Sequence, residues 1–254
     1  MTNEDIIPNW LRRELMRMGL DPSNDQWPPR HTIRMCSVCN QRLKVEFEDT
    51  ASPILKPMMH GTPVVLDRQQ RLIVSRWILK TAALDVLKDV LKVSGNPTIC
   101  VTLINDILLG EPEPSLAPGV FVRLFQTPED TFSGVEPRLG HIVPTAGFPS
   151  PCLLFHVGRF GQIAYELVVA KPMAIYEYAS KTATAARSVN IWPAEGCVGW
   201  PPRRETSSQD IELLRNAHHY NIDNPEEPTY YRWLLTKDGQ WLKWDKDTKD
   251  LGLT

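Results

Sequence analysis

The residues with the clearest chemical potential are Cys36 and Cys39, a Cys-x-x-Cys pair with Asn40 directly after it. Four thiolates, or two thiolates with two imidazoles, close a tetrahedral zinc site. The pair therefore supplies half of such a site. His31 and His60 could complete a Cys2His2 set. A structural zinc is one expectation for this segment.

Other uses of the cysteine pair stay open. Reduced cysteines behave as small hydrophobic residues, and we favour a buried pair at a turn between a strand and a helix. A redox pair is the remaining interpretation. It needs a thioredoxin-like βαβ setting, which the flanking sequence does not predict.

A second candidate for chemistry is the basic cluster Arg12, Arg13 and Arg17, the best phosphate-facing patch in the chain. It belongs to a predicted helix whose other face is apolar. An ordinary solvated helix face explains the cluster equally well.

Trp192 and Trp200, each followed by proline, are expected to cover a β core. A stacking platform for unpaired bases is the alternative, although its only basic neighbours in sequence are Arg203 and Arg204. Lys80 is expected to lay its stem on an apolar neighbour and expose its amine. A phosphate contact is its alternative use.

The elements that must position these residues fall into two regions. The first region predicts helices over 4–18, 40–55 and 64–93 and a strand over 30–35. Pro8 fits a first helical turn, and Pro53 should kink or end the second helix. Asp67 is a fair N-cap for the third helix, which carries a long amphipathic stripe.

The character of the chain changes near residue 95, where apolar β-rich runs begin. Gly158 to Gly161 predict a short hairpin loop, and Asp238-Gly239 suits the turn of a C-terminal hairpin. A short helix is expected over 208–219. We predict an α+β protein with a helical domain (1–95), a mixed β domain (96–225) and a hairpin extension (226–254).

Composition limits the function classes. The 254 residues carry a formal net charge of −2, which excludes a chain-wide basic field for nucleic acids. The sequence has no apolar run long enough to predict a membrane span, so no membrane partner is expected. The five cysteines are odd in number and mostly scattered, and the acidic N-terminus does not fit a signal peptide. The expected location is the cytoplasm.

Four motifs, in order, resemble a family. EDIIPNWLRREL resembles the E-H-x-x-P-x-W-L start of HNH-endonuclease-like proteins of bacteria and phages, and TIRMCSVCNQR resembles their R-x-x-C-x-x-C-N core. VVLDRQQRLIVSRWILKTA is similar to the helix that follows that core. IWPAEGCVGWPP resembles their late I-W-P and W-P-P elements. The resemblance extends from residue 4 to about residue 203.

The resemblance implies a ββα element packed on the long helix, in which a hairpin and a helix hold one divalent cation such as Mg²⁺ for phosphodiester hydrolysis in DNA. Position by position, Glu4 and Asn40 match the metal ligands. Glu48 matches a downstream acid that orients a neighbour. Flanking Cys-x-x-Cys pairs hold a separate structural zinc in this family.

The sequence departs from this pattern where catalysis is most sensitive. The general-base histidine is replaced by Asp5, and a carboxylate that ionises near pH ~4 is a much weaker base than imidazole. The upstream cysteine pair that completes the zinc site in many members has no counterpart. The resemblance therefore implies either a divergent metal-dependent endonuclease or a catalytically inactive module that binds nucleic acid or a protein partner of unknown kind.

Overall fold

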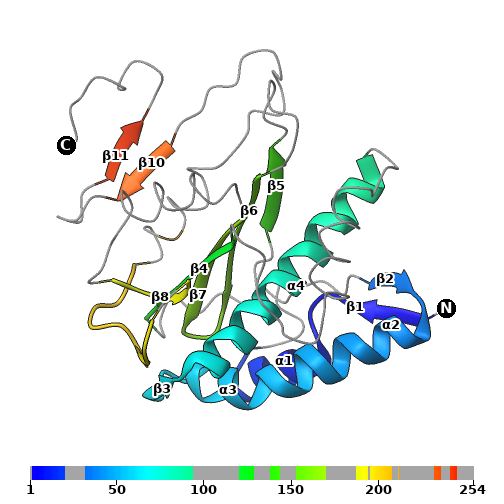
Figure 1. Ribbon diagram of the computed structural model, residues 1–254, viewed down its shortest axis with the longest axis horizontal. Helices are drawn as coiled ribbons and strands as arrows, with labels where there is room; N and C mark the ends of the chain where they lie inside the picture. Colours follow the sequence, from blue (N-terminus) through cyan, green and yellow to red (C-terminus); the bar gives the residue numbers. More distant parts are fainter. Residues whose placement is uncertain are drawn as a thin grey trace.

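The computed structural model describes residues 2–20, 32–93, 120–128, 138–143, 153–169, 187–193, 195–207, 211, 232–235 and 241–244. These residues form an α+β fold, as predicted. The long helix α4 (Arg68–Val93) runs between the N-terminal strands and helices and the antiparallel strands that follow it (Figure 1).

The chain opens with a two-stranded antiparallel ribbon interrupted by a helix. Its elements are β1 (Thr2–Asp5), α1 (Asn9–Arg17) and β2 (Thr32–Met35). The predicted strand near residues 30–35 is confirmed. The helix predicted from residue 4 instead begins after Pro8, which has an extended backbone. The residues that were expected in its first turn pair with β2, since the residue before a proline is disfavoured in a helix.

A helix without a break follows β2. It consists of α2 (Ser37–Arg42), the π-helical η1 (Leu43–Glu48) and α3 (Asp49–Met59). Pro53 was expected to kink or end this helix, and the second alternative is wrong, because the helix continues through Pro53. An internal proline costs about 3 kcal/mol. Leu55, Met58 and Met59 are fully buried beyond it, and burying three such side chains contributes about 5–9 kcal/mol, which outweighs that cost.

Helix α4 begins at the predicted cap, Asp67, but the helix predicted from residue 64 is wrong for its first residues, because Val64–Leu66 form the strand β3 and pair with Val198–Trp200. The amide of Gln70 donates to Asp67 Oδ1 (2.8 Å), and the amide of Asp67 donates to Gln70 Oε1 (3.0 Å), which is a reciprocal capping box. From Trp77 to Asp85 every residue of α4 is buried. Protein covers both faces of this stretch. The predicted amphipathic pattern, with one apolar face and one solvent-exposed face, is therefore wrong here.

The second region contributes a five-stranded sheet in the order β5-β6-β7-β4-β8, antiparallel throughout. The strands are β4 (Val120–Gln126), β5 (Arg138–Val143), β6 (Leu153–Phe160), β7 (Ile163–Val169) and β8 (Ser188–Trp192). The predicted hairpin is confirmed, with Gly161 at a φ of 60° in its turn. Its loop is shorter than the predicted residues 158–161, because Gly158 pairs with Tyr165 inside the β6–β7 ladder. The amide of Gln162 donates to the carbonyl of Met59 (3.0 Å), which attaches this turn to the end of α3.

Two smaller strand pairs complete the described fold. They are β3 (Val64–Leu66) with β9 (Val198–Trp200), and β10 (Arg232–Leu235) with β11 (Trp241–Trp244). The strands of the C-terminal hairpin are confirmed. Its Asp238-Gly239 turn lies outside the described residues, and so does the helix expected over 208–219 except for Ile211.

One hydrophobic core joins residues from both regions, including Leu11 of α1, Trp77 of α4 and Val122 of β4. The predicted boundary near residue 95 lies outside the described residues. Among the helices that are described, none has the length and apolar character required to cross a bilayer.

Candidate functional site

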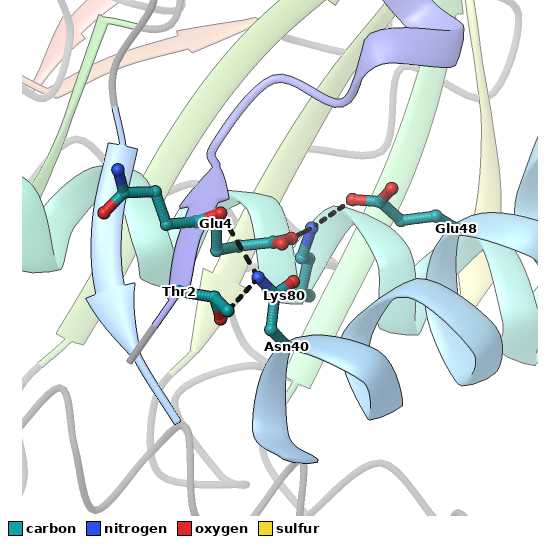
Figure 2. A network of polar contacts seen from close by, with 6 residues as sticks. Thr2, Glu4, Asn40, Glu48 and Lys80 are labelled. Carbon is teal, nitrogen blue, oxygen red and sulfur yellow. Dashed lines mark hydrogen bonds and ion pairs between the residues drawn. The ribbon is translucent and has the colours of Figure 1, made fainter. Parts of the chain in front are cut away.

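A buried lysine lies between two carboxylates at the centre of the N-terminal region. Lys80 Nζ lies 2.9 Å from Glu4 Oε1 and 2.7 Å from Glu48 Oε1 (Figure 2). The Lys80 side chain is 0% exposed, and the two carboxylate side chains are 8% and 13% exposed. The three groups form a nearly dry ion-pair network.

Three separate elements position these groups. Glu4 faces Ile33 across the β1–β2 ribbon, and both are buried because cross-strand partners share the inward face of the ribbon. Glu48 is the last residue of η1. Lys80 lies within the fully enclosed part of α4, so its stem is surrounded by protein and its amine can reach only these carboxylates among its described partners.

The electrostatics of the network are unbalanced. Burial raises the pKa of Glu48, and the neighbouring Glu4 raises it further, while the ammonium of Lys80 acts in the opposite direction. The net shift is upward. One ammonium facing two carboxylates leaves an excess negative charge in a dry site, which a proton on Glu48 relieves.

Asn40 lies at the edge of the same network. Its Nδ2 donates to Thr2 Oγ1 (2.9 Å) and to the carbonyl of Asn3 (3.2 Å). Figure 2 shows the labelled Asn40 beside Glu4 and Lys80. The resemblance assigns Glu4 and Asn40 to one site, and these contacts place the start of α2 against β1, the strand that carries Glu4. The amide of Asn40 serves there as a clamp between α2 and β1.

Asp5 does not join this network. It pairs with the exposed Thr32, whereas Glu4 pairs with the buried Ile33. Successive side chains of a strand face opposite sides, so the half-buried Asp5 lies on the outer face of the ribbon. The structure thus brings Glu4, Glu48 and Asn40 together and places Asp5 apart from them.

Cys36 and Cys39 form a disulfide with Cα atoms 5.3 Å apart. Both residues are exposed at the corner where β2 ends and α2 begins. Cys36 Sγ also accepts a hydrogen bond from the Cys39 amide (3.0 Å), which caps α2. The interpretation as buried, reduced cysteines is wrong, because this corner faces solvent and the sulfurs are bonded to each other.

The histidines proposed to complete a zinc site do not meet the pair within the described residues. His60 Nε2 instead lies 2.9 Å from Glu14 Oε1 of α1, and His31 lies outside the described residues. Glu14 also accepts from Arg17 (2.8 Å). Burial raises the pKa of Glu14, but the hydrogen bonds from His60 and Arg17 lower it more, and its net pKa is below the ordinary value.

The predicted basic patch is exposed in part. Arg13 is exposed and the Arg17 side chain is 66% exposed, one turn apart on the outer face of α1, whereas Arg12 is half-buried. Two arginines of this patch are therefore accessible to a phosphate backbone.

Sequence reasoning missed the role of Lys80, and both uses expected for its amine are wrong because the amine is buried between carboxylates. The sequence did contain a signal for this role, because Lys80 is the single charged residue in the apolar run WILKTAAL. A lysine buried in such a run needs an acidic partner. Trp200 is buried and donates to the Met58 carbonyl (3.3 Å), as a core-covering residue, while Trp192 stays half-exposed.

Comparison of the chain with protein-family models, with curated proteins and with solved structures finds no match. The nuclease resemblance therefore rests on its motifs. The divalent metal that it implies does not fit the described side chains, because both carboxylates already bind Lys80 and Asn40 uses its amide nitrogen on β1. Nor do the described residues bring three His, Cys, Asp or Glu side chains together around an ion position.

Proposed function

We propose that this chain is a nucleic-acid-binding module with a nuclease-like frame that does not hydrolyse phosphodiester bonds. The observation that carries this proposal is the position of Lys80, whose ammonium fills the space between Glu4 and Glu48. In the resembled family, that acidic position holds the catalytic cation.

The chemistry of hydrolysis supports this choice. A divalent cation stabilises the charge that develops on the leaving oxygen, and a positioned base activates the attacking water. The ammonium of Lys80 is fully enclosed, so it cannot contact a phosphate. Asp5, in the place of the base, lies on the outer face of the ribbon, away from Glu4. Neither requirement is met by the described residues.

Binding is proposed to use the outer face of α1. Arg13 and Arg17 are exposed there and present two guanidinium groups one turn apart. Guanidinium contacts with backbone phosphates provide sequence-independent affinity that weakens as salt is added. The net charge of −2 for the whole chain makes such a local patch necessary for any contact with DNA.

The test is a salt titration of duplex DNA binding by fluorescence anisotropy. The double variant Arg13→Gln/Arg17→Gln should bind less tightly, with the slope of log affinity against log salt reduced by about two, near one per lost phosphate contact. The charge-matched control Arg203→Gln/Arg204→Gln, with exposed side chains outside α1, should keep the wild-type slope. Equal slopes for all three proteins would contradict binding through α1.

A metal-dependent DNA endonuclease is the second candidate, because Glu4 and Glu48 converge on one cation-sized position beside Asn40. Supercoiled plasmid incubated with Mg²⁺, Mn²⁺ or Ni²⁺ separates the candidates. We expect intact plasmid. Nicking by the wild type that disappears in Asn40→Ala would establish the enzyme instead. Nicking only by Asp5→His would indicate a site disabled at its base, and it would contradict the position of Asp5 on the outer face of the ribbon.

A further inference from the structure

We infer that Cys36 and Cys39 are a redox-active pair that exchanges its disulfide with the thiols and disulfides of other molecules. This inference goes beyond the proposed nucleic-acid binding and does not depend on it. Both cysteines are exposed at the corner between β2 and α2, and their sulfurs are bonded to each other. Exposed disulfides are in general the labile ones, because an attacking thiolate can reach their sulfur atoms.

A junction between a strand and a helix positions the two cysteines. Cys36 directly follows β2 and is the N-cap of α2, and Cys39 lies in the first turn of that helix. Their Cα atoms are 5.3 Å apart. The described strands do not build a thioredoxin-like βαβ unit here, since β2 pairs with β1 and β3 pairs with β9. The local junction alone brings the two sulfurs together at the surface.

The two sulfurs are not equivalent. The amide of Cys39 donates a hydrogen bond to Cys36 Sγ (3.0 Å). After reduction the same amide stabilises a negative charge on Cys36, because a hydrogen bond to an ionised acceptor is the stronger one. Within the described part of the chain, Cys39 Sγ has no such donor. Cys36 is therefore the attacking sulfur of the reduced pair, and Cys39 is the sulfur that resolves the intermediate.

The nearest charges along the chain also favour an anionic sulfur. The first charged residue before the pair is Arg34, which is exposed, and the first one after it is Arg42, which is paired with Glu46 (2.9 Å). The two acidic residues of β1 lie at the other end of the β1–β2 ribbon. Basic neighbours increase the share of a cysteine that is present as the reactive thiolate.

The exchange consists of two displacements. The Cys36 thiolate attacks one sulfur of a substrate disulfide, whose S–S bond breaks and releases one thiolate. The Cys39 thiolate then attacks Cys36 Sγ, which breaks the mixed disulfide, releases the second substrate thiolate and forms the Cys36–Cys39 bond. The pair gives its two electrons to the substrate, and the protons of the two cysteine thiols pass to the two released thiolates. A dithiol reductant returns the pair to its reduced state.

Alkylation of two single-site variants tests the assigned roles. Cys39→Ser leaves Cys36 beside the amide of residue 39, and Cys36→Ser leaves Cys39 without a donor, while serine still caps the helix. At neutral pH, iodoacetamide should modify Cys36 in the first variant at least about fivefold faster than Cys39 in the second. Cys197, which is free and exposed, is the internal reference in peptide mass spectrometry. Equal rates at Cys36 and Cys39 would overturn the inference.

Exchange itself is measured with glutathione disulfide. The wild-type chain is reduced with dithiothreitol without denaturant and freed of it, and it should then convert glutathione disulfide to glutathione and regain the Cys36–Cys39 bond. Cys39→Ser should stop at a mixed disulfide on Cys36 and release about half as much glutathione. A disulfide that dithiothreitol reduces only after the chain is unfolded in urea would contradict the inference. So would a reduced pair that retains Zn²⁺ and does not exchange.

Discussion

Lys80 of α4 lies 2.7 Å from Glu48 at the end of η1, and the lysine side chain has no solvent exposure. Removing one partner of a buried ion pair leaves the other charge uncompensated, which typically costs about 3–5 kcal/mol. Lys80→Met should therefore lose about that much unfolding free energy in urea denaturation at neutral pH. The triple variant Lys80→Met/Glu4→Gln/Glu48→Gln should recover part of the loss. A loss below about 1 kcal/mol for Lys80→Met would show that the network is not buried in solution.

The raised pKa of Glu48 predicts a pH dependence with a definite sign. Burial and Glu4 shift this pKa above its ordinary value of 4.5, so the folded state binds a proton more readily than the unfolded state. The unfolding free energy should then increase as the pH falls through the folded pKa toward the ordinary value, and decrease as the pH rises again. Glu48→Gln, whose amide oxygen can still accept from Lys80, should lack this slope. Glu46→Gln, at a half-exposed position of the same helix, is the control that should retain it.

A second pH effect concerns Tyr165, whose hydroxyl lies 3.1 Å from His156 Nδ1 while His156 Nε2 lies 3.4 Å from Asp85. Burial, assisted by the charge of Asp85, raises the pKa of Tyr165 above its ordinary value of 10. Above that pH the unfolded state loses the phenol proton and the folded state keeps it, so the unfolding free energy should fall. Tyr165→Phe should lose roughly 0.5–1.5 kcal/mol at neutral pH for the missing hydrogen bond.

The unfolding free energies of the wild type and of Tyr165→Phe, plotted against pH, should converge in alkaline solution. The phenylalanine variant lacks the group whose ionisation favours unfolding, so its deficit relative to wild type should shrink as the pH rises past about 10. Urea denaturation across this range measures the difference, in which effects common to both proteins cancel. A deficit that stays constant would argue against a buried phenol.

The clamp formed by Asn40 predicts a local effect. Its Nδ2 donates to Thr2 Oγ1 and the Asn3 carbonyl, so Asn40→Ala should lower the unfolding free energy by about 1 kcal/mol. The amides of β1 should also exchange faster with deuterium, since α2 no longer holds the strand. Gln41→Ala changes the next, exposed residue and should leave β1 exchange as in wild type. Equal exchange in both variants would contradict the clamp.

Local signals predicted the parts of the fold that depend on local interactions. The Asp67 cap and the glycine-bounded hairpin at Gly161 follow from neighbouring residues alone. The strand β1 could not be predicted from neighbouring residues, because residues 2–5 become a strand only by pairing with residues 32–35. The helix through Pro53 was missed for a similar reason, since the burial that stabilises it comes from distant elements.

In the candidate site, too, some features could be predicted from the sequence and others could not. The nearness of Asn40 to Glu4 was implied by the resemblance to HNH-endonuclease-like proteins, and the contact of Asn40 with Asn3, next to Glu4, agrees with it. The third member of the network could not be located, because Lys80 lies 76 residues from Glu4 and no local pattern links them. The hydrogen bond from Arg71 to the carbonyl of Gly196 shares this property, since the two residues meet only in the folded chain.

The central claim, that the ammonium of Lys80 takes the position of a catalytic cation, is tested most directly by titrating Mn²⁺ into the wild-type chain in a calorimeter at neutral pH. The account predicts no saturable heat of binding for the wild type and for Glu4→Gln alike. Stoichiometric binding of Mn²⁺ by the wild type that is lost in Glu4→Gln would contradict it, because a metal would then hold the position assigned to the lysine.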